Sequence, residues 1–118
     1  MRSAFVLSFV ALAGCSFAAR SPEMYKKDTE KLLATKTPVI KACYDEQLKG
    51  NPGLAGRATV KFEVEPSSGK LTHIAVDAGG TTVPDALAQC VVRAIDGLVL
   101  NPGDQKQGVA TFSYEFKK

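Results

Sequence analysis

Two stretches of the chain alternate between apolar and polar residues, which is the pattern of a β-strand with one buried face. They cover residues 57–65 and 108–116, and their apolar positions are Ala58, Val60, Phe62 and Val64 in the first and Ala110, Phe112, Tyr114 and Phe116 in the second. A turn at residues 66–69 leads to a return strand over residues 70–77. In the return strand Leu71 falls on the face opposite Ile74, so the pattern indicates a bulge or a partly covered outer face.

Two other stretches carry apolar residues at helical spacing. The first begins at Thr37 and Pro38 and ends at the breakers from residue 50 to 53, and its stripe consists of Ile40, Cys43, Tyr44, Gln47 and Leu48. The second follows Thr82, whose side chain we expect to cap the helix, and its stripe consists of Leu87, Cys90, Val91, Ala94, Ile95 and Leu98. The order α-β-β-α-β predicts an α+β domain over residues 37–118, with a three-stranded antiparallel sheet packed by two helices on one face.

The first residues have the pattern of a secretory signal peptide. One arginine, Arg2, precedes an apolar run over residues 4–13, which is shorter than the roughly 20 residues needed to span a membrane. The run ends in Leu12-Ala13-Gly14-Cys15, which resembles the lipobox of bacterial lipoproteins. That resemblance implies removal of residues 1–14 and a lipid on the Cys15 thiol. Ordinary signal cleavage after Ala18 is the alternative.

Residues 15–36 are polar and rich in lysine, and we expect a membrane-proximal tether with one or two helical turns near its end. Ser16 follows the expected lipidated position, and by resemblance to lipoprotein sorting rules a serine there permits transfer to the outer membrane. We therefore expect a periplasmic, lipid-anchored protein.

Two further cysteines, Cys43 and Cys90, lie on the apolar stripes of the two predicted helices. An even pair of cysteines in a small exported domain favours a disulfide, worth roughly 4 kcal/mol for a loop of this length. Two buried free thiols are one alternative. A zinc site with His73 is another, although these ligands lack the close spacing of zinc sites.

Composition and charge narrow the function further. The 118 residues are 45% hydrophobic and 23% charged, which is typical of one small globular domain. The 15 basic and 12 acidic residues form no block of like charge, so we expect no nucleic-acid surface. The chain has no phosphate-binding glycine loop, nucleophile elbow or metal motif. We therefore expect no enzymatic activity, no catalytic residue, no metal and no cofactor.

Three segments resemble the AgmX/PglI-type C-terminal domain, a TonB C-terminal-like module of envelope proteins. They are Ile40-Lys41-Ala42-Cys43-Tyr44, the Gly-Arg-x-x-Val-x-Phe strand that begins at Gly56, and Cys90-Val91. The resemblance covers residues 37–118 and implies that the family's paired cysteines correspond to Cys43 and Cys90. The chain departs from the family where an aromatic-Pro segment is usual, because it has Leu100-Asn101-Pro102 there. The expected lipid anchor would stand in place of the membrane helix of TonB-type transducers, so the resemblance implies the fold and binding mode but not energy transduction.

The resemblance implies a non-catalytic module that binds an extended segment of an envelope protein at a free sheet edge. It assigns this role to the last strand, whose outward positions are Val109, Thr111, Ser113 and Glu115. The alternative for this edge is that Glu115, Lys117 and Lys118 only protect it from pairing. Alternatives for the whole protein are a structural or accessory subunit of a transport, secretion or gliding assembly, and a cell-wall-binding lipoprotein. Pairing of two such edges would give a homodimer.

Overall fold

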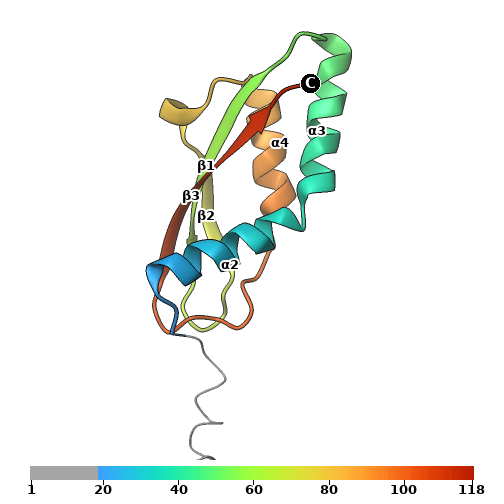
Figure 1. Cartoon of the computed structure of the whole chain (residues 1–118). Coiled ribbons are helices and arrows are strands. Elements are labelled where there is room, and N and C mark those ends of the chain that lie inside the picture. Colours follow the sequence, from blue (N-terminus) through green and yellow to red (C-terminus); the bar gives the residue numbers. More distant parts are fainter. Residues whose placement is uncertain (1–18) are drawn as a thin grey trace, which may run out of the picture.

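The computed structural model describes residues 19–118 and is an α+β domain (Figure 1). Its elements in chain order are α2 (Pro22–Ala34), α3 (Thr37–Gly50), β1 (Gly56–Val64), β2 (Leu71–Val76), the short 3-10 helix η2 (Ala78–Gly80), α4 (Asp85–Ile95) and β3 (Gly108–Phe116). The sheet has the three antiparallel strands that we expected, but the described residues contain one α-helix more than predicted. The predicted signal peptide and Cys15 lie outside the described residues.

Strand β1 is the centre of the sheet, whose order is β2-β1-β3. It pairs with β3 along its whole length, from Gly56 opposite Phe116 to Val64 opposite Gly108. The apolar side chains of β1 form the middle of the core, and Val60 and Val64 have no exposed surface. The alternating pattern of β1 therefore predicts its buried face correctly.

A bulge in β2 changes which residues of that strand reach the core. Lys61 of β1 pairs with Ala75, and Glu63 pairs with Thr72. Between these two pairs β2 therefore has one residue more than β1. His73 lies in the bulge with a φ of 52°. Leu71 thereby reaches the core and is 2% exposed, whereas Thr72 lies opposite the outward-facing Glu63. The bulge is confirmed, but strict alternation would have placed Thr72 on the core face with Ile74, and that is wrong.

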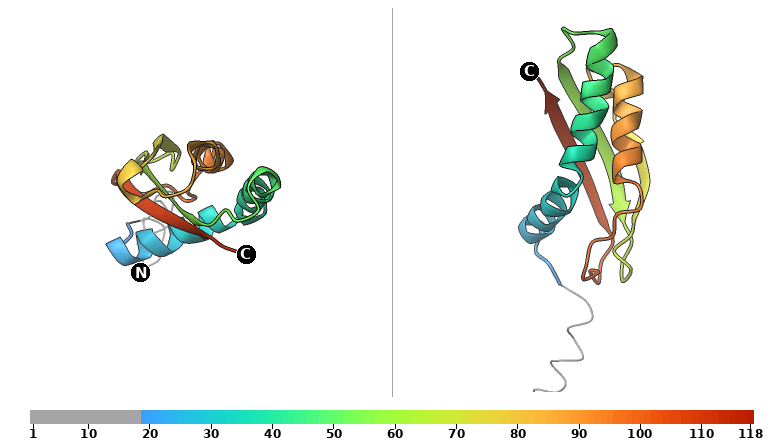
Figure 2. Two further views of the ribbon diagram at one scale, coloured as in Figure 1. Left: turned by 90° about the horizontal axis from the view of Figure 1, so that it is seen from above. Right: turned by 90° about the vertical axis from the view of Figure 1, so that its right-hand side faces the viewer.

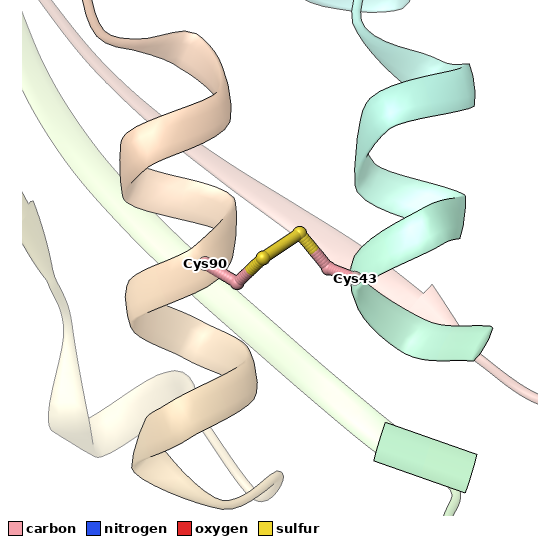
Figure 3. The surroundings of a disulfide bond; sticks show 2 residues. All are labelled: Cys43 and Cys90. Carbon is pink, nitrogen blue, oxygen red and sulfur yellow. A yellow bond between two sulfur atoms is a disulfide. The ribbon is translucent and has the colours of Figure 1, made fainter. Parts of the chain in front are cut away.

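Helices α3 and α4 lie side by side on one face of the sheet (Figure 2). The strong apolar stripe of α4 explains this packing, since Leu87, Val91 and Ile95 have no exposed surface. A disulfide joins Cys43 of α3 to Cys90 of α4, with 6.0 Å between their Cα atoms (Figure 3). The predicted disulfide is confirmed. It also removes both thiols from the alternative zinc site.

Thr82 does not cap α4 as we expected. The residue before the helix is Pro84, which makes no side-chain capping hydrogen bond. The Thr82 hydroxyl instead accepts a hydrogen bond of 2.8 Å from the backbone N–H of Arg57. The Thr82 N–H donates to the Arg57 carbonyl at 2.8 Å. The segment before α4 therefore supplies hydrogen bonds to the backbone of β1 at Arg57, where β2 no longer runs beside it.

Helix α2 differs from the tether that we expected over residues 15–36. Ser21 caps it by accepting a hydrogen bond from the Met24 N–H, and Pro22 occupies its first turn. Thr29 and Leu33 are 0% and 2% exposed, so one face of the helix is packed against the domain. The folded unit therefore begins well before residue 37. No helix within residues 19–118 is long and apolar enough to cross a membrane.

Candidate functional site

Strand β3 is an edge strand, because within residues 19–118 it pairs only with β1. The four outward positions identified from the sequence are exposed in the structure, and they are Val109, Thr111, Ser113 and Glu115. Val109 is 78% exposed, which is unusual for a valine in a strand. Two of the other side chains contact β1 on the outer face, since Ser113 is hydrogen-bonded to Thr59 at 2.7 Å and Glu115 is 3.4 Å from Arg57.

The backbone of these four residues points to the free edge, and the hydrogen bonds of β1 establish this. The carbonyls of Arg57 and Thr59 accept hydrogen bonds from Thr82 and Asp77, which lie on the side of β1 away from β3. Successive residues of a strand direct their backbone groups to opposite sides, so Ala58 and every second residue after it hydrogen-bond to β3. The residues of β3 that lie opposite them have even numbers. The odd-numbered residues 109–115 therefore direct their N–H and C=O groups away from the sheet.

Two hollows adjoin this strand and together form what we call the β3 groove. One, of about 520 Å³, lies between the end of β3 and α3 and is lined by Ile40, Tyr44 and Tyr114 among others. The other, of about 470 Å³, lies between the beginning of β3 and α2 and is lined by Tyr25, Ala110 and Phe112 among others. Figure 2 shows α2 beside β3, on the side away from β1. The free edge is thus bordered by helices and apolar side chains as well as by solvent.

Two tyrosine hydroxyls beside the groove are buried and have no hydrogen-bond partner within the described residues, and they belong to Tyr25 and Tyr114. Burial raises the pKa of Tyr114 to about 12. Burial and the Asp104 carboxylate raise the pKa of Tyr25, although Arg20 opposes this. Both hydroxyls are therefore protonated at neutral pH.

A buried ion pair fixes the beginning of the groove. The side chains of Arg20 and Asp104 are each 3% exposed, and the guanidinium lies 3.5 Å from the carboxylate. The Arg20 backbone N–H donates to the same carboxylate at 3.0 Å, and the guanidinium donates to Asp28 and to the Pro102 carbonyl. Burial acts to raise the pKa of Asp104, but backbone N–H groups of Arg20 and Lys106, with the Arg20 charge, hold that pKa below its usual range. These contacts fasten the start of α2 to the loop that leads into β3.

The remaining candidate from the sequence, His73, lies at the opposite edge of the sheet. It is exposed, and its Nδ1 atom is 3.1 Å from the Glu63 carboxylate. Within residues 19–118 no three His, Cys, Asp or Glu side chains are grouped as metal ligands.

Sequence reasoning identified the strand but missed what surrounds it. It overlooked Arg20, Tyr25 and Asp104, because each belongs to a segment that we interpreted as tether or loop. A signal was present in Ser21-Pro22, which is a favourable start for a helix. Comparison of the chain with protein-family models, with curated proteins and with solved structures finds no match.

Proposed function

We propose that this protein is a non-catalytic lipoprotein of the cell envelope that binds an extended segment of a protein partner by adding it as a strand to β3. The observation that supports this function is the free edge of β3 beside an apolar groove. Backbone groups at residues 109, 111, 113 and 115 can hydrogen-bond to the partner, and the groove can receive every second side chain of the partner.

The likeness to the TonB C-terminal domain is part of this proposal. It rests on the α+β architecture, on the cysteine pair that joins α3 to α4, and on the position of β3 at the sheet edge. The lipid on Cys15 and the outer-membrane location rest on the sequence pattern alone. An anchored domain of this kind would hold its partner close to the membrane.

The test uses the full-length protein in its own cells, with a photo-crosslinking amino acid in place of Val109. This side chain is exposed and apolar, so its replacement breaks no side-chain hydrogen bond. We expect one partner to be crosslinked at this position and not at Arg93, an exposed residue of α4. Mass spectrometry of the adduct identifies the partner, and an adduct with a second copy would show a homodimer instead.

A matched pair of variants tests whether the partner binds as a strand. Thr111→Pro removes an N–H from the free edge and leaves the hydrogen bonds between β3 and β1 in place, so it should abolish the adduct. Thr111→Ala retains the N–H and should preserve the adduct. Circular dichroism of both variants checks that they fold. A folded Thr111→Pro protein that is crosslinked as efficiently as Thr111→Ala would rule out strand addition at β3.

A further inference from the structure

The acidic residues that line the β3 groove take part in ion pairs. Each has a basic partner, and the pairs are Asp45–Lys41 at 2.9 Å, Asp104–Arg20 at 3.5 Å and Glu115–Arg57 at 3.4 Å. Arg20 also pairs with Asp28, so the beginning of the groove keeps one carboxylate charge that Arg20 does not balance.

Four lysines that line the groove have no acidic partner within residues 19–118, and they are Lys26, Lys106, Lys117 and Lys118. They lie in two groups. Lys26 and Lys106 are at the beginning of β3, and Lys117 and Lys118 follow its last residue. At the beginning of the groove Arg20, Lys26 and Lys106 outnumber the carboxylates of Asp28 and Asp104, so both ends of the groove are positive.

Between these two groups β3 is uncharged from Val109 to Tyr114. On the groove side it presents Ala110, Phe112 and Tyr114, which are partly buried. The groove thus has an apolar middle and two basic ends. These ends are separated by the length of β3, which is about 30 Å for nine residues at roughly 3.3 Å each.

We propose, on the basis of the function proposed above, that the segment bound by β3 carries acidic residues at both ends and alternating apolar residues between them. Its length is that of β3, about nine residues. The apolar side chains fill the two hollows, where they are removed from water. The acidic side chains at both ends of the segment lie beside the four lysines. This attraction orients the segment and accelerates its association.

Three fluorescent peptides test this inference. All share a central Val-Thr-Val-Ser-Val, and both ends of each peptide carry the same pair, which is Asp-Glu, Ser-Gly or Lys-Arg, so that each peptide has the length of β3. Fluorescence anisotropy with the purified protein, disulfide intact, gives their dissociation constants at low salt. Because exposed ion pairs each contribute little, we expect the acidic peptide to bind about tenfold more tightly than the neutral one, and the basic peptide to bind most weakly. Raising the salt concentration should reduce the difference.

Charge reversal at the end of β3 supplies the matched variants. Lys117→Glu combined with Lys118→Glu should remove or invert the preference for acidic ends. The control combines Lys49→Glu with Lys70→Glu, which changes the net charge equally at exposed positions outside the groove, and it should retain the preference. All four side chains are exposed, so these variants should fold, and their amide NMR spectra verify this.

The NMR spectra also separate this inference from the function on which it rests. Equal binding of the three peptides, with shifts of the Thr111 and Ser113 amides, would refute the acidic preference and leave strand addition standing. No binding, or binding without shifts at these amides, would refute both. A preference that persists in the variant at residues 117 and 118 would refute the role of the lysines there.

Discussion

Arg20 and Asp104 form the most deeply buried ion pair of the described chain, with 3% of each side chain exposed. A buried charge depends on its partner, since water cannot replace the lost interaction. The Asp104 carboxylate also accepts backbone hydrogen bonds from Arg20 and Lys106. The beginning of β3 is therefore held in place by polar contacts, whereas the middle of the sheet is held by apolar packing.

Replacing Asp104 with alanine should destabilise the protein strongly. Asp104→Ala removes the carboxylate that pairs with the buried Arg20 guanidinium. It should lower the free energy of unfolding by about 3 kcal/mol, measured by urea denaturation. The control is Asp45→Ala, whose ion pair with Lys41 has 53% and 69% of the two side chains exposed and is worth at most about 0.5 kcal/mol. Equal losses in the two variants would contradict the structural role of the Arg20–Asp104 pair.

The same pair should make stability depend on pH in the acidic range. The pKa of Asp104 is lowered by folding, so its contribution is complete above the unfolded value of about 3.9 and is lost as the pH falls through the lower folded value. The difference in melting temperature between wild type and Asp104→Asn should therefore be constant near neutrality and shrink below about pH 4. A difference that does not change down to pH 2.5 would exclude this titration.

The unpartnered hydroxyl of Tyr114 should cost stability. Removing a buried polar group that lacks a hydrogen bond relieves its desolvation penalty, so Tyr114→Phe should raise the free energy of unfolding by about 1 kcal/mol. Tyr44→Phe is the matched control, because the Tyr44 hydroxyl donates to the Leu54 carbonyl at 2.6 Å, and this variant should be destabilised by about 1 kcal/mol. Opposite signs in chemical denaturation would support the assignment, and two losses of the same size would contradict it.

At the scale of elements, α3 and α4 depend on each other through the disulfide as well as through apolar contacts. Cys43 and Cys90 are separated by 47 positions, so the bond shortens a long loop of the unfolded chain. Both helices cover the same face of the sheet, and the disulfide bridges them there (Figure 3). The disulfide thus adds stability to a core of modest size.

Removing both cysteines should lower stability without changing the fold. The double variant Cys43→Ala and Cys90→Ala should lose about 3–4 kcal/mol of unfolding free energy in urea. Non-reducing peptide mapping of the wild type from unperturbed cells should recover the two cysteine peptides linked. Recovery of two free thiols, or an unchanged urea midpoint in the double variant, would argue against this contribution.

At the scale of the whole molecule, the packing of α2 shortens the link to the proposed anchor. The folded part begins near Arg20, so five residue steps separate it from Cys15 and span at most about 18 Å. A tether that reached residue 36 would have allowed a larger distance between the folded part and Cys15. If Cys15 is lipidated, the domain and its β3 groove lie close to the membrane surface.

Replacing Cys15 tests the anchor. Cys15→Ala removes the thiol that would carry the lipid, so the protein should leave the membrane fraction. Cell fractionation and intact-mass measurement of the purified membrane form provide the readout, and the lipid should appear as added mass on a chain that begins at Cys15. An unmodified chain that begins at Ala19 or Arg20 would overturn lipidation, and recovery in the inner membrane would overturn the outer-membrane location.

The sequence by itself determined the α+β class, the two helices that cover the sheet and the alternating faces of β1 and β3. These features are local, because the spacing of apolar residues along one element decides which face is buried. Only the tertiary structure decided that α2 packs on the domain, that Leu71 reaches the core and that a groove with basic ends borders β3. The packing of α2 depends on Asp104, far from Arg20 in the chain, and the register of β2 depends on its neighbour. Periodicity within a segment carries no information about such partners.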